Sequence, residues 1–326
     1  MTRASASDVA AALLEESPTT DRPTVEVEGR QLRLSNLTKV LYPETGFTKG
    51  QVIDYYLKIS PVLLAHVANR PLTVRRFPNG VDGESFYEKH RPRGTPEWVK
   101  SVRVLASPNA RDRNGVEFVV LSELATLIWA ANLAALELHV PQWRVNRAGN
   151  PQPPDLLVFD LDPGAGADMA HCAEVALLLA EELRNDHGWT AYPKASGSKG
   201  LQLYVPLAKA ERQKTWDDGG TRELARSVAE ELSRRRPDLV VANMRKDLRK
   251  GRVLIDWSQN HVAKTTVAPY SLRARAEPTV STPVTWAEIE QVVDDGKGER
   301  LRFLPPDVLE RVAELGDLFA PLESGR

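Results

Sequence analysis

The chain has 326 residues, with 43 lysines and arginines against 44 aspartates and glutamates, so a surface that is positive all round is excluded but a local basic patch is not. The single cysteine, Cys172, excludes an intrachain disulfide and a zinc site made of several thiolates, and it fits a reducing cytoplasm. No apolar run reaches the roughly 18 residues of a membrane helix, and no secretory signal is recognisable, so no membrane contact is expected.

Residues 1–23 are predicted to be an accessory segment. A short helix over 9–16 is expected there, and a Ser-Pro pair ends it. The remainder, 24–326, is predicted to be one domain with two parts. An N-terminal subdomain extends to about residue 150, and a catalytic core over 151–326 follows a rigid Pro-rich connector.

Three elements are predicted in the N-terminal subdomain. Residues 24–34 alternate apolar and polar side chains around Glu28-Gly29, which indicates a β-hairpin. Apolar residues at helical spacing predict one helix over 49–68 and another over 123–138.

The second half of the chain mixes strands and helices without a strict β-α-β rhythm. Strands are predicted at 156–159, at 201–205 and at 253–255, and a further strand is predicted to follow Gly188 and lead to Tyr192. Helices are predicted at 170–183, 221–235 and 286–293, and a loop at 278–283. This mixture predicts an α+β fold in which helices flank one catalytic sheet, with an N-terminal α/β subdomain beside it.

Asp160 and Asp162 give the first chemical signal. Alternate residues of a strand face the same way, so both carboxylates should project together where the strand ends at Pro163-Gly164. Two negative charges so near each other favour the binding of a cation, and oxygen ligands suit Mg²⁺ or Mn²⁺. The alternatives are two solvated carboxylates or an aspartate-nucleophile phosphatase, in which Gly-Thr normally follows the second aspartate.

Three further stretches carry polar groups that suit phosphate or metal. The Ser196–Gly200 turn combines glycines, hydroxyls and Lys199, although its spacing is not that of a Walker loop. Asp256 closes an apolar strand and is a candidate third metal ligand. Lys264 and Arg273 suit a phosphate chain. Taken singly, each has a plain alternative as a solvated turn, a strand-end carboxylate or surface charge.

Together and in this order, these stretches resemble the archaeo-eukaryotic primase superfamily, and within it the polymerase domain of bacterial DNA ligase D. The resemblance runs from about Leu34 to about Phe319. Its signature blocks correspond to 158–164, 196–206, 253–260 and 264–273. It implies a primase-polymerase fold and a template-directed, divalent-metal-dependent nucleotidyltransferase that extends primers and fills short gaps in DNA repair.

The resemblance also implies residue roles. Two ions, Mn²⁺ or Mg²⁺, would be held by Asp160, Asp162 and Asp256. The NTP or dNTP substrate would be bound by His139, Ser196, Lys199, Gln202, Arg249, Lys264 and Arg273. A downstream 5′-phosphate of gapped or broken DNA would be bound by Asn36, Lys39 and Lys49. Template bases would stack on Phe86 and Tyr87. A structural role for the histidine, and core positions for the two aromatics, are the alternatives.

Two departures from that family matter. The first is Gln202, which stands where the family usually has histidine and cannot carry charge. Either Gln202→His would raise catalytic efficiency, or the pocket has repacked around the amide.

The second departure is that no Lys-x-Asp-Gly adenylation motif is present, which predicts a stand-alone polymerase. Its expected location is the cytoplasm, in association with the nucleoid. Its expected partners are a separately encoded ATP-dependent DNA ligase and Ku. The competing hypothesis is a 5′-phosphate DNA end-binding module with weak catalysis that recruits a ligase.

Overall fold

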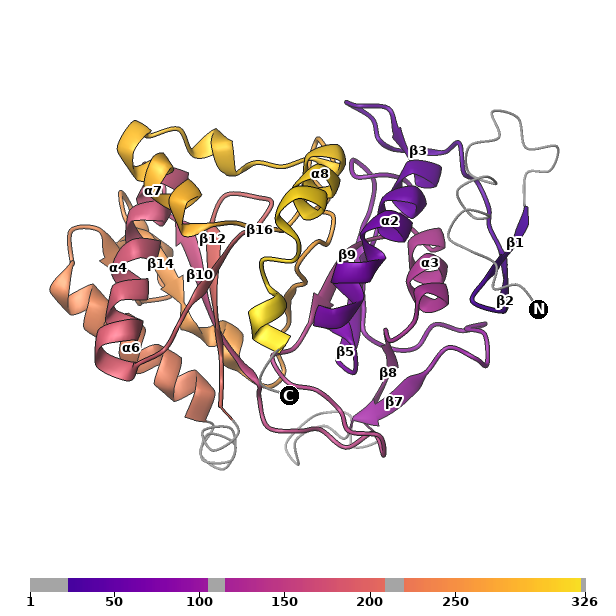
Figure 1. Cartoon of the computed structure of the whole chain (residues 1–326), viewed down its shortest axis with the longest axis horizontal. Helices are drawn as coiled ribbons and strands as arrows, with labels where there is room; N and C mark the ends of the chain where they lie inside the picture. The colour runs from indigo at the N-terminus through magenta and orange to yellow at the C-terminus, as the bar shows by residue number, and fades with distance from the viewer. Residues whose placement is uncertain (1–22, 105–114, 209–219, 324–326) are drawn as a thin grey trace.

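A computed structural model of the chain describes residues 23–104, 115–208 and 220–323 (Figure 1). The helix expected over 9–16 therefore lies outside the described residues. Within them the chain forms two six-stranded sheets and two small two-stranded ribbons, with helices packed against the sheets. The predicted mixed α+β class is confirmed. In Figure 1 the sheet of the N-terminal half and the sheet of the C-terminal half lie side by side.

The N-terminal half begins with the predicted hairpin of β1 (Thr24–Val27) and β2 (Arg30–Arg33), whose turn residues Glu28 and Gly29 have φ of 49° and 77°. The predicted long helix is α2 (Lys49–Val67), which Thr48 caps. The other elements of this half are β3 (Val40–Tyr42), β4 (Phe47–Thr48), β5 (Pro71–Arg76), β6 (Phe86–Glu88), β7 (Ser101–Val104), β8 (Val116–Val120), α3 (Leu124–Asn132) and β9 (Ala135–Val140).

The helix predicted over 123–138 is wrong beyond Asn132. There α3 ends, Ala134 adopts a left-handed φ of 58°, and β9 begins at Ala135. Every residue of β9 is buried, because the strand lies between β5 and β15 (Thr266–Val267). A strand buried on both faces loses the alternation of apolar and polar residues, so its sequence resembles a continued apolar helix.

The C-terminal half forms the second sheet, in the order β13-β14-β10-β12-β11-β16. Its elements are β10 (Leu156–Pro163), α4 (Met169–His187), β11 (Tyr192–Ala195), β12 (Leu201–Pro206), α6 (Gly220–Arg235), β13 (Val240–Val241), η1 (Lys246–Arg249), β14 (Val253–Asp256), η2 (Trp257–Asn260), β16 (Thr282–Pro283), α7 (Trp286–Asp295), η3 (Gly298–Leu301), α8 (Pro305–Leu315) and η4 (Ala320–Glu323). The predicted helices and the strands at 156–159, 201–205 and 253–255 are present, several with longer ends, but the strand predicted to lead up to Tyr192 instead begins at that residue and runs to Ala195. The predicted loop at 278–283 is wrong at its last two residues, which form β16 and pair with β11.

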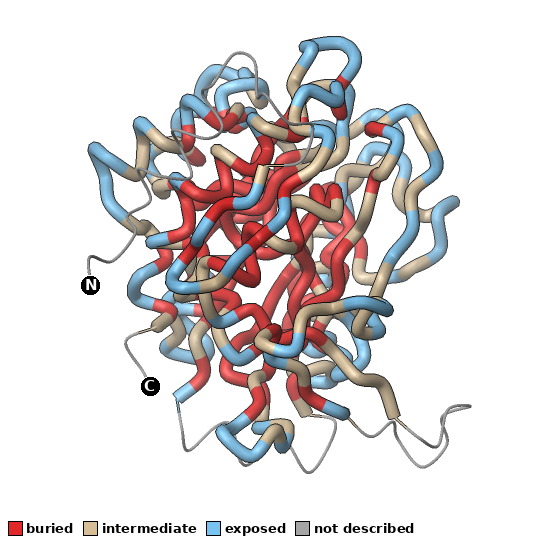
Figure 2. Tube along the Cα trace, turned by 90° about the vertical axis from the view of Figure 1, so that its right-hand side faces the viewer, coloured by how far each residue is buried: buried red, intermediate tan, exposed pale blue. Residues whose placement is uncertain are grey.

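Side-chain alternation along β10 positions the two aspartates. Phe159 and its alternate neighbours belong to the main core, which α4 also joins. On the other face, Leu156 and Val158 are covered by Phe319 and Leu322 of the C-terminal segment. The same face continues as Asp160 and Asp162, where this apolar cover stops. Figure 2 shows the buried residues gathered in the centre of the molecule.

The two sheets are joined by several contacts. The short strand β15 comes from the C-terminal half but pairs with β9. The buried guanidinium of Arg70 forms an ion pair with Asp155 at 2.8 Å, and Arg144 contacts the same carboxylate at 2.7 Å. The Nε2 atom of His66 lies 2.8 Å from Asp317. Among the described helices, none is both long and apolar enough to cross a bilayer.

Candidate active site

The strand register places Asp160 between two polar partners. Asp160 on β10 lies directly opposite Asp256 on β14 and opposite Gln202 on β12. Directly opposed residues of an antiparallel pair project to the same face, so the three side chains form a row across the sheet. Asp162 shares that face two residues further along β10. The pattern thus gathers the three predicted carboxylates at one end of the sheet.

The charges of these carboxylates are held in an unfavourable environment. Burial, the charge of Asp162 and that of Asp256 raise the pKa of Asp160 to about 7, against a lowering hydrogen bond from Gln202. Burial and Asp256 also raise the pKa of Asp162, while Arg249 opposes the change. Desolvated like charges are relieved by a cation, so Asp160 and Asp162 fit a hard divalent ion.

Asp256 is less available for a metal. Its Oδ1 accepts hydrogen bonds from the backbone and the hydroxyl of Ser258, and its Oδ2 accepts from Gln259 at 2.9 Å. Within the described ranges, no three histidine, cysteine, aspartate or glutamate side chains converge closely enough to hold a metal ion. Asp256 therefore fits as a third ligand only if a cation displaces those donors or binds the same carboxylate oxygens beside them.

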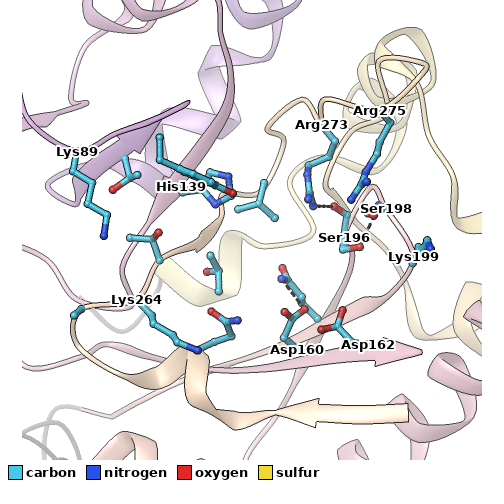
Figure 3. Close-up of a pocket in the computed structure, with 18 residues that line it drawn as sticks. Lys89, His139, Asp160, Asp162, Ser196, Ser198, Lys199, Lys264, Arg273 and Arg275 are labelled. Atoms are coloured by element: carbon cyan, nitrogen blue, oxygen red, sulfur yellow. Dashed lines mark hydrogen bonds between the residues drawn. The ribbon is translucent and has the colours of Figure 1, made fainter. Parts of the chain in front are cut away.

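A pocket of about 790 Å³ opens over Asp160 and Asp162. The predicted nucleotide-binding residues that line it are His139, Ser196, Lys199, Gln202, Lys264 and Arg273. In Figure 3, Ser196, Ser198 and Arg273 lie on one side of the pocket, and Lys264 and Lys89 lie on the other. A negatively charged ligand would enter between two cationic walls with the carboxylates at one end.

The Ser196–Gly200 turn is shaped by its glycines. The hydroxyl oxygen of Ser196 accepts hydrogen bonds from the backbone N–H groups of Ser198 at 3.2 Å and Gly200 at 3.3 Å. Gly197 has a φ of 68°, and a Cβ there would lie 2.6 Å from the carbonyl oxygen of Val280. Only glycine satisfies both constraints, so the turn is built for close approach. Lys199 is exposed beside it.

Arg273 and His139 are both held by Glu137. Arg273 donates to Oε1 of Glu137 at 3.2 Å and to the carbonyl oxygen of Ser196, while Nε2 of His139 lies 3.0 Å from Oε2. Despite burial, the hydrogen bond with His139 and the charge of Arg273 lower the pKa of Glu137 to about 2. Burial lowers the pKa of His139. An ionised Glu137 therefore orients a neutral imidazole and a guanidinium toward the pocket.

Arg249 is the predicted nucleotide ligand that does not line the pocket. It ends η1, and its guanidinium donates to the carbonyl oxygen of Met244. Gly164 lets this segment approach, since a Cβ there would lie 1.8 Å from the carbonyl oxygen of Arg249. Arg249 acts on the site through its charge, which lowers the pKa of Asp162. On the opposite wall, Lys264 donates to the hydroxyl of Ser258.

A second cationic site lies at the start of α2. Lys49 is buried, and its ammonium donates to the carbonyl oxygen of Ser35 at 2.6 Å. Burial, then the charges of Lys39 and Arg76, lowers the pKa of Lys49 to about 8. Lys39 and Asn36 are exposed, and the backbone of Lys39 bonds with both Asn36 and Lys49. The positive charges of Lys39 and Arg76 both act on Lys49, and Arg76 also pairs with Glu88 at 3.0 Å, so an anion bound at Lys49 would be favoured. The sequence analysis missed Arg76, which only the fold brings to this place.

Phe86 and Tyr87 are exposed, with 45% and 58% of their surfaces accessible, so the expectation of exposure is confirmed. Consecutive residues of a strand face opposite sides. Tyr87 faces the pocket, 5.6 Å from the ring of His139, and Arg75 lies over it at 5.5 Å. Arg76 lies over Phe86 at 5.2 Å. The two rings therefore face opposite sides of β6 and do not form one platform.

Nine residues that line the pocket had no role assigned from the sequence, among them Lys89, Ser198, Gln259 and Arg275. Ser198 belongs to the glycine-rich turn that the sequence analysis recognised, so the sequence did contain a signal for it. Lys89, Gln259 and Arg275 carried no local pattern, because they reach the pocket from a strand end, the short helix η2 and a loop whose positions depend on the whole fold.

Comparisons with known proteins bear on the family and the fold. A family model described as LigD, primase-polymerase domain, matches residues 48–319. The chain belongs to the LigD primase-polymerase domain family. The chain of a solved structure, described as the polymerase domain from Mycobacterium tuberculosis ligase D in complex with DNA, is 42% identical, with a TM-score of 0.80; the match covers 90% of this chain and 98% of that one. The family resemblance and fold inferred from the sequence are thus confirmed.

Curated LigD proteins from several bacteria are also similar. The multifunctional non-homologous end joining protein LigD of Mycolicibacterium smegmatis is 45% identical over 294 residues, which are 90% of this chain and 36% of that protein. The bifunctional non-homologous end joining protein LigD of Bacillus subtilis is 32% identical over 260 residues, 80% of this chain and 40% of that protein. The chain thus spans less than half the length of these relatives.

Proposed function

We propose that this protein is a DNA repair polymerase: a template-directed nucleotidyltransferase that extends a primer strand across short gaps and breaks during non-homologous end joining. The observation that carries the proposal is the row of Asp160, Asp256 and Gln202 across the sheet, of which Asp160 and Gln202 line a pocket with cationic walls. The related LigD proteins are named for non-homologous end joining, and the similar polymerase domain is in complex with DNA. A role in DNA repair and a nucleic-acid substrate follow from these similarities.

Each wall of the pocket has a role in the proposed reaction. The hydroxyl of Ser196, with Lys199 and Arg273, would hold the triphosphate through charge-assisted hydrogen bonds. Lys264 would balance phosphate charge from the opposite side. His139 is neutral, so it would contact the sugar by hydrogen bonding and not by charge.

Asp160 and Asp162, with Asp256, would hold two divalent ions, Mn²⁺ or Mg²⁺. When bound, such ions lower the pKa of an attacking 3′-hydroxyl and neutralise a pyrophosphate leaving group. The carboxylates would fix the reacting strand end against the triphosphate. Burial and mutual repulsion disfavour the ionised forms of Asp160 and Asp162, so binding of a cation to the metal-free site would be favoured.

The cluster of Asn36, Lys39, Lys49 and Arg76 would bind the 5′-phosphate at the downstream edge of a gap. A terminal phosphate carries more charge than an internal diester and gains more from converging cations. Phe86, on the same side as Arg76, would stack on a neighbouring base, and Tyr87 would stack on a base within the pocket. An ATP-dependent DNA ligase activity and Ku are the proposed partners.

Primer extension on a duplex with a one-nucleotide gap tests the proposal. Substrates with and without the 5′-phosphate are compared, with Mn²⁺ or Mg²⁺ and with ribonucleotides or deoxyribonucleotides. We expect addition that depends on the template base and the divalent ion. Binding of gapped DNA without any addition would favour the alternative, an end-binding module that recruits a ligase.

A further inference from the structure

A line of hydrogen bonds runs beneath the pocket and ends at Asp160. Gln142 Nε2 donates to Thr266 Oγ1 at 2.8 Å, and Thr266 Oγ1 lies 3.3 Å from the hydroxyl of Tyr204. Tyr204 donates to Gln202 Oε1 at 3.4 Å, and Gln202 Nε2 donates to Asp160 Oδ1 at 3.0 Å. We call Gln142, Thr266, Tyr204 and Gln202 the relay.

The carboxylate of Asp160, at the end of the relay, determines which group donates in each hydrogen bond. In its ionised form, which a bound cation favours, Asp160 only accepts, so Gln202 must present its NH₂ group to Asp160 and its oxygen to Tyr204. Tyr204 uses its single proton for Gln202, and its oxygen is left to accept from the hydroxyl of Thr266. Thr266 in turn accepts from the amide of Gln142. All donors therefore point the same way, an arrangement in which successive bonds polarise one another.

The relay is protected from water and connects the two sheets. Its four residues are between 3% and 5% exposed, so solvent does not compete for these bonds. Gln202 and Tyr204 lie on one face of β12, whereas Thr266 lies on β15 in the other sheet. Thr266 also lines the pocket. Asp160 is thus linked to the opposite pocket wall by uncharged groups alone.

We propose that the relay is a set of positioning residues for Asp160. It commits Oδ1 to Gln202, so that Oδ2 would be the oxygen available to a cation, and it fixes the distance between Asp160 and the pocket wall at Thr266. Within the described residues no hydrogen bond to Oδ2 is formed. Glutamine at position 202 then serves the carboxylate and is not a weakened phosphate ligand. This role rests on the proposed metal-dependent function.

Mn²⁺ affinity of the DNA-free protein, measured by electron paramagnetic resonance of free Mn²⁺, tests the relay without relying on activity. Gln202→Leu should weaken Mn²⁺ binding by about 10-fold or more, as loss of a metal ligand's hydrogen-bond partner commonly does. Tyr204→Phe should weaken it by about 3-fold. The matched control is Tyr192→Phe, because Tyr192 lies directly beside Tyr204 on β11 and outside the relay.

The double variant separates positioning from general damage. If Tyr204 acts through Gln202, then Tyr204→Phe should have no further effect on Mn²⁺ affinity in the Gln202→Leu background. Melting curves of all variants show whether each one is folded. Wild-type protein that binds no Mn²⁺ would overturn the metal site and the relay together. The relay alone would be overturned if the wild-type protein binds Mn²⁺ but Tyr204→Phe has the same Mn²⁺ affinity as Tyr192→Phe. Additive losses of Mn²⁺ affinity in the double variant would also overturn it.

Discussion

Gly200 packs directly against the carbonyl of Leu161, the residue between Asp160 and Asp162. A Cβ on Gly200 would lie 2.0 Å from that carbonyl oxygen, which no small shift relieves. This contact places the phosphate-binding turn beside the aspartate strand, so two motifs that are about 40 residues apart in the sequence form one site. The close approach of backbone to backbone is what requires glycine here.

Gly200→Ala should therefore destabilise the protein and misplace the turn. Overpacking against backbone costs about 3 kcal/mol or more, since the strand ladder itself must move. Chemical denaturation measures the loss of unfolding free energy. The control is Gly50→Ala, where the nearest atom to the new Cβ is 3.2 Å away and the position is helical. Equal stability of the two variants would contradict the close contact.

Asp160→Asn, Asp162→Asn and Asp256→Asn should each lower nucleotide addition by about 100-fold or more. Each change keeps the shape of the side chain and removes a charge that a divalent ion needs. Affinity for gapped DNA should persist, because cations and exposed aromatics supply it. Primer extension and equilibrium binding are measured on the same proteins. Asp294→Asn, at an exposed position, is the control. Extension at the wild-type rate by any of the three would exclude that residue as a ligand.

The metal-free protein should lose stability as pH rises from about 4 to about 7. Asp160 has a pKa of about 7 in the folded protein, against about 3.9 in an unfolded chain, so between these values the folded state holds a proton that the unfolded state has released. Asp160→Asn removes this penalty. It should raise Tm at pH 8 in EDTA, by roughly 2–4 °C for each kcal/mol recovered, and give no gain at pH 4. A gain that is independent of pH would refute the linkage.

Lys49→Met should abolish the preference for a 5′-phosphate on gapped DNA. Methionine keeps much of the buried stem but removes the ammonium, whose pKa is lowered by burial and by the charges of Lys39 and Arg76. Because the pKa of Lys49 is about 8, the wild-type preference should also weaken as pH rises from 7 to 9. Binding constants with and without the phosphate, at fixed salt, measure the effect. Lys58→Met, on an exposed part of α2, is the control. A preference that survives in Lys49→Met would place the phosphate elsewhere.

Gln202→His should not raise catalytic efficiency, in contrast to the first expectation from the sequence. The amide of Gln202 donates to Asp160 and accepts from Tyr204, and an imidazole has a different spacing between its two nitrogens. We expect a loss of about 2- to 10-fold in kcat/KM. Steady-state kinetics at two pH values decide the matter. A higher efficiency, larger at the lower pH, would show that a protonated histidine contacts the triphosphate.

Local sequence pattern determined much of the metal end of the site. The alternation along 156–162 was enough to place Asp160 and Asp162 on one face, because strand side chains have a period of two. The Glu28-Gly29 hairpin, the helix over 49–68 and the glycine-rich turn were likewise predicted from the sequence, since each depends on neighbouring residues. Where β9 is buried on both faces, that local signal vanished and the helix was predicted too long.

Only the tertiary structure decided which distant residues meet. The register of β10 against β14 and β12 sets Asp160 opposite Asp256 and Gln202, and no local preference specifies a register between strands so far apart in the chain. The burial of Lys49 beside Arg76 arises in the same way. Sequence patterns fix which face a side chain takes, whereas its neighbours and its pKa depend on long-range packing that excludes water.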